Sequence, residues 1–460
     1  MKKRVPLWRL LPGIGAIVIG VLFNPWTARL TSSDGQLETG TSLMILGFDV
    51  FMIFVGLLCL FATRALITGL LVSLVAGVIS IVVIDLLARP LLRSQLYYRP
   101  EDIYKHRLPE LPALSIFDLN VNYSGRTWGD LSAMTTQDSL RDMRDVDFRT
   151  DSYGFRNDAS DIDTTRPLDL IILGDSFGAG AGTTQEDVWG VVFHRRYGLN
   201  TYNLSMPGFG PWNQLLSLKR ELSRLRVGPN TVVLWAIFGG NDIDEPCFAN
   251  LNPAPAGFWQ RLAVRTRTFY RRSPIKIITD RALMGLNSQI PRDTAIVSTL
   301  PDGRSFLFYS QYLRHELRTL DDLHRHPNLP SLRLVFAEMA RVASDAGLTV
   351  VVAHLPTAYA IYGWALDQIE PWTNERLRSP ASLIFEELSR ENGFDFIDLQ
   401  PQLLEEAQTL YTQSRELLWW RDDTHWNNHG HAAAAKIVGE WLQSPRDLVR
   451  PVSYNSGGSD

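Results

Sequence analysis

After residue 150, short apolar runs alternate along the chain with stretches of helical periodicity. Such uniformly apolar runs are typical of strands that are buried on both faces of a parallel sheet. The runs are Leu168–Leu173, Thr201–Leu204, Thr231–Ile237, Thr349–His354 and Phe394–Leu399. The clearest helical stretches between them are Pro211–Leu225, Ser331–Ala346 and Ser382–Glu391. This alternation predicts an α/β domain, a three-layer α/β/α sandwich around a parallel, five-stranded sheet.

The first apolar run is followed by small and polar residues, in the sequence LDLIILGDSFGAGAG from Leu168 to Gly182. Gly174 ends the strand, and Asp175 and Ser176 follow at once, where we expect a helix to begin. A serine at a helix N-terminus is often a simple cap for the first backbone N–H groups. The same place suits a nucleophile, because those N–H groups stabilise negative charge. Ligands gather at the carboxyl ends of such strands, so both roles stay open for Ser176.

Other candidate residues lie after later strands and near the C-terminus. Gly208 lies in a proline-bounded loop after the second strand, and Asn241 follows two glycines after the third. Near the C-terminus, Asp422 and Asp423 directly precede Thr424 and His425. With the serine, these residues supply a hydroxyl, a backbone N–H, a side-chain amide and an acid–histidine pair. That set is what acyl transfer through a serine needs: a nucleophile, oxyanion donors and a base oriented by a carboxylate.

These four blocks make the chain resemble the SGNH (GDSL-like) hydrolase family. Members carry a G-D-S block on the first strand, an isolated loop glycine, a G-x-N-D block and a late D-x-x-H block. In this sequence the blocks are Gly174–Ser176, Gly208, Gly239–Asp242 and Asp422–His425, in the family's order. The resemblance covers about residues 150–445, and it rests on the order of all four blocks, since each block alone is a weak signal.

The resemblance implies that Ser176 is the nucleophile and His425 the general base. The N–H groups of Ser176 and Gly208 and the side-chain amide of Asn241 would then form the oxyanion hole. The usual family spacing implies Asp422 as the acid that orients the histidine. The sequence segment DTHWN is also similar to that of polysaccharide O-acetyltransferase relatives, in which the acid stands two residues before the histidine. That similarity leaves Asp423 as the alternative acid.

The N-terminal part holds three apolar segments that each approach the roughly 20 residues needed to cross a bilayer. They are about Leu7–Trp26, Ser42–Ala62 and Ala65–Leu87, and they predict an N-terminal bundle of three transmembrane helices. The basic start MKKR favours a cytoplasmic N-terminus. Three crossings then place the large domain outside the cytoplasm, although Arg89 and Arg93 argue against this orientation. We therefore expect a multi-pass membrane protein, in contact with the lipid bilayer, whose catalytic domain is extracytoplasmic.

These segments define the expected domains. Residues 1–88 form the membrane domain, 89–150 a polar, proline-punctuated connector, 151–445 the α/β domain, and 446–460 a disordered tail. About 85 residues, at roughly 245–330, separate the third strand from the helix before the fourth. Such a long connection is typical of an inserted lid or subdomain.

Composition excludes some functions. The net charge of −4 and the pI near 6.2 give no reason to expect nucleic acid as a partner. The two cysteines, Cys59 and Cys247, lie far apart and imply no disulfide framework. His429 and His431 lie near His425, but no thiolate or further acid has ligand spacing. We therefore interpret those two histidines as capping or surface groups and expect no metal and no cofactor.

Two functional hypotheses of different classes follow. The first is a membrane-anchored serine esterase that removes acyl groups, O-acetyl among them, from a surface glycan or a lipid-linked sugar, or an O-acyltransferase that passes them to a sugar hydroxyl. The second is a non-catalytic subunit of this fold in a membrane assembly with unidentified partners. The intact blocks favour the enzyme, because a disused site has no physical need to keep Ser176, Asn241 and His425 together.

Overall fold

The computed structural model describes residues 7–22, 24, 26–27, 39–61, 64–96, 99–135, 138–245, 250–279, 294–365 and 378–444. The chain divides into two compact units. The first consists of Met1–Leu92 and Ser273–Ser288, and the second of Arg93–Arg272 and Gln289–Asp460. The expected disordered tail, 446–460, lies outside the described residues, as does Cys247.

The first unit contains a closely packed helix pair. Helix α1 (Leu7–Leu22) packs against helix α3 (Thr39–Phe61), and glycines lie at the contact. A Cβ atom on Gly56 would lie 2.7 Å from the carbonyl oxygen of Gly13. Because a real Cβ does not approach an oxygen so closely, these backbones can touch only where a side chain is lacking.

The prediction of three transmembrane helices is wrong. None of the helices in the described part of the chain is long and apolar enough to cross a membrane. Helix α1 has 16 residues, fewer than the roughly 20 that a crossing needs, and helix α3 carries Asp49 near its middle. Helix α4 (Arg64–Leu96) carries Asp85 and Arg89, which form a salt bridge of 2.7 Å. The expected multi-pass membrane localisation, which rested on these helices, is corrected by the same finding.

The second unit contains a parallel, five-stranded sheet with the strand order β11-β10-β7-β5-β6. The strands are β5 (Leu170–Leu173), β6 (Thr201–Asn203), β7 (Val232–Phe238), β10 (Thr349–Leu355) and β11 (Asp395–Asp398). Every neighbouring pair is parallel. The carboxyl ends of all these strands therefore share one edge of the sheet, and the segments that carry the candidate serine, glycine and asparagine start from that edge.

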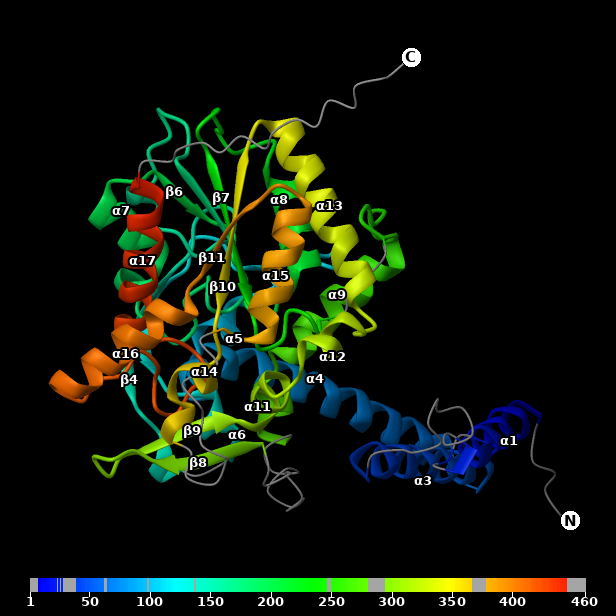
Figure 1. Cartoon of the computed structure of the whole chain (residues 1–460). Coiled ribbons are helices and arrows are strands. Elements are labelled where there is room, and N and C mark those ends of the chain that lie inside the picture. Colours follow the sequence, from blue (N-terminus) through cyan, green and yellow to red (C-terminus); the bar gives the residue numbers. More distant parts are fainter. Residues whose placement is uncertain are drawn as a thin grey trace, which may run out of the picture. The chain divides into compact units, whose positions relative to one another are not determined.

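Helices cover both faces of this sheet (Figure 1). One face carries α7 (Trp189–Tyr197), α16 (Gln400–Ser414) and α17 (Asn428–Gln443), and the other carries α8 (Pro211–Glu221), α13 (Leu329–Ala346) and α15 (Pro380–Glu391). The buried side chains form two clusters, one with the helices of each face. The predicted three-layer α/β/α sandwich is thereby confirmed, without the N-terminal bundle.

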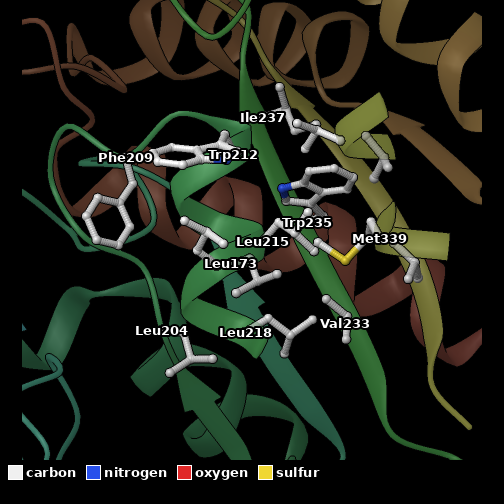
Figure 2. Packing of buried hydrophobic residues seen from close by; sticks show 14 of the residues in the cluster. Leu173, Leu204, Phe209, Trp212, Leu215, Leu218, Val233, Trp235, Ile237 and Met339 are labelled. Carbon is white, nitrogen blue, oxygen red and sulfur yellow. The ribbon is translucent and has the colours of Figure 1, made fainter. Parts of the chain in front are cut away.

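Strand β7 serves both clusters. Val233, Trp235 and Ile237 belong to one cluster, and the residues between them belong to the other, because successive side chains of a strand point to opposite faces. Figure 2 shows these three side chains along the strand, beside helix α8. The indole Nε1 of Trp235 donates a hydrogen bond of 2.7 Å to Oε1 of Gln214. This bond satisfies the indole N–H, the one polar atom that the tryptophan side chain brings into the core.

Three two-stranded antiparallel sheets complete the strands of the described residues. They pair β1 (Lys105–Arg107) with β2 (Ser115–Phe117), β3 (Asn122–Thr127) with β4 (Arg144–Arg149), and β8 (Ala295–Thr299) with β9 (Ser305–Tyr309). The first two sheets, with α5 (Pro100–Tyr104) and α6 (Asp130–Thr135), lie in the stretch expected as a connector. That stretch is therefore structured, while the domain boundaries at residues 88, 150 and 445 stay predictions.

The long insertion expected at about 245–330 has secondary structure of its own. It contains α9 (Phe258–Arg271), the β8–β9 hairpin, α11 (Ser310–Glu316) and α12 (Leu320–His324). Helix α14 (Ala358–Tyr362) follows strand β10. The insertion reaches the carboxyl edge of the sheet, because Arg318 forms a salt bridge of 2.7 Å with Asp244 in the loop after β7.

Candidate active site

Ser176 lies at the carboxyl edge of the sheet, three residues after the end of strand β5. The segment that follows is a series of turns and not the predicted helix, since α7 begins only at Trp189. Gly180 and Gly182 have φ angles of 70° and 75°, which interrupt helical geometry and suit residues without a Cβ. The N–H of Ala181 donates a hydrogen bond of 2.9 Å to the carbonyl oxygen of Ser176. The serine is thus presented on a tight, glycine-rich bend and stays half-buried.

Ser176 and His425 meet although 249 positions separate them in the sequence. Oγ of Ser176 lies 2.7 Å from Nε2 of His425, and Nδ1 on the other side of the ring lies 2.8 Å from Oδ1 of Asp423. An ionised carboxylate can only accept hydrogen bonds, so Nδ1 carries the proton and donates a hydrogen bond to Asp423. Nε2 is then free to accept the hydroxyl proton of Ser176.

The two neighbouring aspartates have separate partners. Oδ2 of Asp422 accepts hydrogen bonds from the N–H of Gly129 at 2.7 Å, from Oγ of Ser132 at 2.8 Å and from the N–H of Asp142 at 2.9 Å. Asp422 is 0% exposed and ties this earlier part of the chain to the histidine segment. The structure therefore brings Asp423, the alternative acid, to the histidine ring, and it places Asp422 against a different set of donors.

Gly208 and Asn241 lie on the loops after β6 and β7, at the same edge of the sheet as Ser176. Gly208 has a φ angle of 74°, a left-handed conformation that a residue with a side chain rarely adopts. Nδ2 of Asn241 donates a hydrogen bond of 3.3 Å to Oε1 of Glu245. Burial raises the pKa of that glutamate. Since an amide nitrogen has two hydrogens, Asn241 keeps a second donor.

Sequence analysis missed three charged residues at this site: Arg99, Asp130 and Arg144. Both guanidinium groups donate to Oδ2 of Asp423, Arg144 at a distance of 2.7 Å. Oδ2 of Asp130 lies 3.6 Å from Nδ1 of His425. All three come from the stretch expected as a connector, and no local motif marks them. Charged residues in a polar stretch are ordinary surface groups unless the fold buries them.

These charges set the ionisation of the acid. Burial alone would raise the pKa of the Asp423 carboxyl, but Arg99, His425 and Arg144 outweigh burial and hold that pKa well below its ordinary value. Burial, with the nearby charge of Asp423, raises the pKa of Asp130. Asp423 is consequently a carboxylate at neutral pH, as an acceptor of the Nδ1 proton must be.

Asp130, Asp423 and His425 also offer ligand atoms within 4.8 Å of one another, which is close enough to hold a metal ion. The surroundings suit such an ion poorly. Arg99 and Arg144 already donate to Asp423, and their two positive charges would repel a divalent cation at this distance. The expectation of a site without metal stays a prediction.

The segment that carries His425 is fixed by buried neighbours. His431 is 1% exposed and packs at right angles to Trp426, with 5.6 Å between the ring centroids, so its interpretation as a surface or capping group was wrong. Burial lowers its pKa to about 3. The cap of helix α17 is instead Asn427, whose side chain accepts a hydrogen bond of 3.0 Å from the N–H of Gly430. The segment that carries His425 is therefore held by buried side chains and by the capped start of helix α17.

A second Ser–His–Asp set lies at neighbouring strand ends. Nδ1 of His354 lies 2.9 Å from Oδ1 of Asp398, and Oγ of Ser379 lies 3.4 Å from Nε2 of His354. Ser379 is 3% exposed, and its hydroxyl accepts a hydrogen bond of 3.2 Å from the N–H of Ser382 as the cap of helix α15. We interpret this set as structural, because its serine is occupied as a cap and closed to substrate.

Arg156 organises the bend after the serine. Its side chain is 0% exposed, and its guanidinium donates to the carbonyl oxygens of Ala179 at 3.1 Å and Thr183 at 2.5 Å. It also donates to Oε1 of Gln185 at 3.1 Å and to Oε1 of Glu101 at 3.3 Å. Burial lowers the pKa of this arginine to about 10, which still leaves it charged at neutral pH.

Arg156→Met is expected to lower the free energy of unfolding by about 3–5 kcal/mol, the usual cost of removing one partner of a buried ion pair. The substitution leaves the Glu101 carboxylate buried without its cation, and the carbonyl groups of the bend lose their donor. Urea denaturation followed by circular dichroism measures the loss. Arg166→Met is the matched control, because Arg166 pairs with Asp169 at the surface and should cost less than about 1 kcal/mol. Equal losses in the two variants would contradict the role given to Arg156.

Residues 306–450 match the family model described as the SGNH hydrolase-like domain of the acetyltransferase AlgX. The comparison with curated proteins gave no match. Among solved structures, TesA is 14% identical, with 60% of this chain and 97% of TesA covered and a TM-score of 0.30. The acetyl xylan esterase AlAXEase is 13% identical, with coverages of 59% and 97% and a TM-score of 0.30. A putative acylhydrolase from Bacteroides fragilis is 10% identical, with coverages of 60% and 89% and a TM-score of 0.28.

The family match covers one end of the site. It contains Asp423 and His425, whereas Ser176, Gly208 and Asn241 precede the matched residues. The resemblance that the four sequence blocks indicate is confirmed by this match: residues 306–450 are similar to the SGNH hydrolase-like domain described for the acetyltransferase AlgX.

Proposed function

We propose that this protein is a serine acyl esterase that acts on acyl esters of a glycan, O-acetyl esters among them, through Ser176, His425 and Asp423. The observation that carries the proposal is the distance of 2.7 Å between Oγ of Ser176 and Nε2 of His425. That distance is within the reach that a general base needs. The match to the SGNH hydrolase-like domain of an acetyltransferase supports acyl chemistry.

The first half of the reaction forms an acyl-enzyme. Oγ of Ser176 attacks the ester carbonyl while Nε2 of His425 takes its proton. The imidazolium that forms is stabilised by the Asp423 carboxylate 2.8 Å from Nδ1. The negative charge on the former carbonyl oxygen is then stabilised by hydrogen bonds from the N–H groups of Ser176 and Gly208 and from the second side-chain N–H of Asn241. The tetrahedral intermediate collapses when His425 returns the proton to the leaving sugar oxygen.

The second half resolves the acyl-enzyme. His425 removes a proton from water, which attacks the acyl carbon. The bond between that carbon and Oγ of Ser176 then breaks as His425 returns the proton to Oγ, which releases the carboxylic acid and free Ser176. A sugar hydroxyl in place of water follows the same steps and makes the protein an O-acyltransferase. The description of the matched family as an acetyltransferase favours this second candidate, and the two differ only in the acceptor that reaches the acyl-enzyme.

The non-catalytic alternative has less support. A scaffold subunit needs neither a serine hydroxyl within hydrogen-bond distance of a histidine nor a buried acid held on the other side of that ring. Burying the Asp423 carboxylate carries a desolvation cost. A catalytic task for Asp423 in a Ser176–His425–Asp423 triad gives a reason for a chain to keep this costly group.

A fluorophosphonate probe tests the proposal. We expect the probe to attach covalently to Ser176 in the wild-type protein and to be located there by peptide mass spectrometry, because an activated serine attacks phosphorus as it attacks an ester. Ser379→Ala is the matched control, since Ser379 belongs to the capped, buried Ser–His–Asp set. The control should label at the wild-type rate.

A wild-type protein that stays unlabelled, or labels at Ser379, would refute the proposal. Activity on 4-nitrophenyl acetate and on acetylated polysaccharide then identifies the acyl substrate. Adding an unacetylated oligosaccharide separates the two candidates: an esterase releases acetate at the same rate, whereas a transferase yields acetylated oligosaccharide at the expense of acetate.

A further inference from the structure

The two oxygens of the Asp423 carboxylate have different partners. Among the described residues, Oδ1 accepts hydrogen bonds from His425, from its backbone N–H at 3.1 Å and from its Nδ1 at 2.8 Å. Oδ2 accepts from the guanidinium groups of Arg99 and Arg144, the latter at 2.7 Å. One oxygen therefore serves the base, and the other is held by two cations.

Arg144 is itself fixed in place. Its Nε donates to the carbonyl oxygen of Gly182 at 3.1 Å, and its Nη1 donates to the carbonyl oxygen of Asp142 at 2.9 Å and to Oδ1 of Asp422 at 3.1 Å. The guanidinium carbon lies 4.2 Å from the ring centroid of Trp420. A side chain with so many partners holds its fork in one orientation, which lets it define the position of Asp423.

We propose that Arg144 and Arg99 are positioning residues for the acid of the triad. By holding Oδ2 of Asp423 they keep Oδ1 directed at Nδ1 of His425, and they thereby fix the tautomer in which Nε2 faces Ser176. This inference rests on the proposed function, because it takes Asp423 as the acid of a working triad.

Burial and charge support this role. Asp423 is 0% exposed, and the side chains of both arginines are 7% exposed. Rotating the carboxylate away from His425 would break charge-assisted hydrogen bonds that water cannot replace at a buried site. The two guanidinium groups also lie against the carboxylates of Asp422 and Asp423 and hold the pKa of Asp423 low, so the acid stays ionised beside His425.

These arginines give the stretch before the first strand of the main sheet a part in catalysis. Arg99 precedes α5, and Arg144 is the first residue of β4. Both lie well before residues 306–450, which match the family model. Asp422 binds the same stretch through Gly129, so the acid segment and the arginine segment are joined at two adjacent positions.

A double-mutant cycle tests the proposal on the full chain. Arg144→Met is expected to lower kcat for 4-nitrophenyl acetate about 10- to 100-fold, by analogy with the loss that follows removal of a group that orients a metal ligand. KM should stay nearly constant, because Arg144 does not touch the substrate. In an Asp423→Asn background the same substitution should change kcat less than about 3-fold, because an effect that acts through the acid disappears with the acid.

Three further variants complete the test. Arg144→Lys keeps the positive charge and should recover part of the lost kcat; it and Arg99→Lys also serve if Arg144→Met fails to fold. Arg149→Met is the matched control, because Arg149 lies on the same strand β4 and pairs with Asp158 at 2.9 Å. Its kcat should equal that of the wild type.

Equal fold-losses of kcat from Arg144→Met in both backgrounds would overturn the positioning role, since a merely structural arginine acts regardless of the acid. An unchanged kcat in Arg144→Met would overturn it as well. These failures are distinct from failure of the proposed function, which appears as a wild-type protein that the fluorophosphonate probe does not label at Ser176.

Discussion

Ser176→Ala is expected to reduce kcat for ester hydrolysis roughly 10⁶-fold, the loss found when the serine of such a triad is removed. Without Oγ the His425 base has no hydroxyl to activate and no acyl-enzyme forms. Among the described residues, the hydrogen bond to His425 is the one that Oγ makes, so the fold should be unaffected. Initial rates with 4-nitrophenyl acetate measure the loss, and thermal unfolding checks that the variant is folded.

A faint residual rate is compatible with this mechanism, because oxyanion donors accelerate hydrolysis without a nucleophile. Titration with the fluorophosphonate probe excludes traces of wild-type enzyme. Activity within 10-fold of the wild type, or undiminished labelling, would mean that another group attacks the ester. In that case the contact between Ser176 and His425 would have to be explained as a structural hydrogen bond.

Asp423→Asn is expected to lower kcat about 10⁴-fold, the effect of the same replacement in a serine triad. An amide can present N–H where Oδ1 now accepts, which favours the tautomer of His425 with its proton on Nε2. That tautomer cannot take the proton of Ser176. Asp422→Asn is the matched control: it is the adjacent residue of the same type, equally buried, and its carboxylate contacts two backbone N–H groups and the side chains of Ser132 and Arg144 instead of the ring.

The control should lower stability and reduce kcat less than about 10-fold, in line with an orienting role one step removed. A larger kcat loss in Asp422→Asn than in Asp423→Asn would restore the acid that the family spacing implies.

The pH dependence of stability is a second measurement on Asp423. Because the pKa of Asp423 is lowered by folding, its ionisation stabilises the protein above about pH 3.9, and this contribution disappears as the pH falls through the lowered pKa. Wild type and Asp423→Asn should therefore converge in stability at acid pH.

The sequence was sufficient for features that depend on local patterns. The uniformly apolar run ending at Leu173 predicted a strand buried on both faces, and strand ends in a parallel sheet must share an edge. Ser176, Gly208 and Asn241 could be placed at that edge for this reason. The helix expected after Ser176 failed because Gly180 and Gly182 take left-handed conformations, which a preference for helix N-termini does not reveal.

Features that depend on long-range contacts were not predictable. Asp422 and Asp423 are identical and adjacent, and their roles separate only through the direction each side chain takes in the folded turn. From the sequence, Arg99 and Arg144 are indistinguishable from other polar connector residues, because no local pattern indicates that they are buried. The N-terminal segments were judged by hydropathy over about 20 residues, and the helix bounds and the acidic Asp49 within α3 count against that judgement.

The sequence separations inside the site determine when the protein can become active during its synthesis. Ser176 precedes His425 by 249 positions, and Asp423 follows Arg99 by 324 and Arg144 by 279. Contacts so distant in sequence form late, because the entropy of closing the intervening chain must be overcome first. A ribosome-bound chain that already exposes the serine still lacks its base and acid. Under the proposed function, a nascent chain therefore cannot cleave esters until the two ends of the second unit have come together.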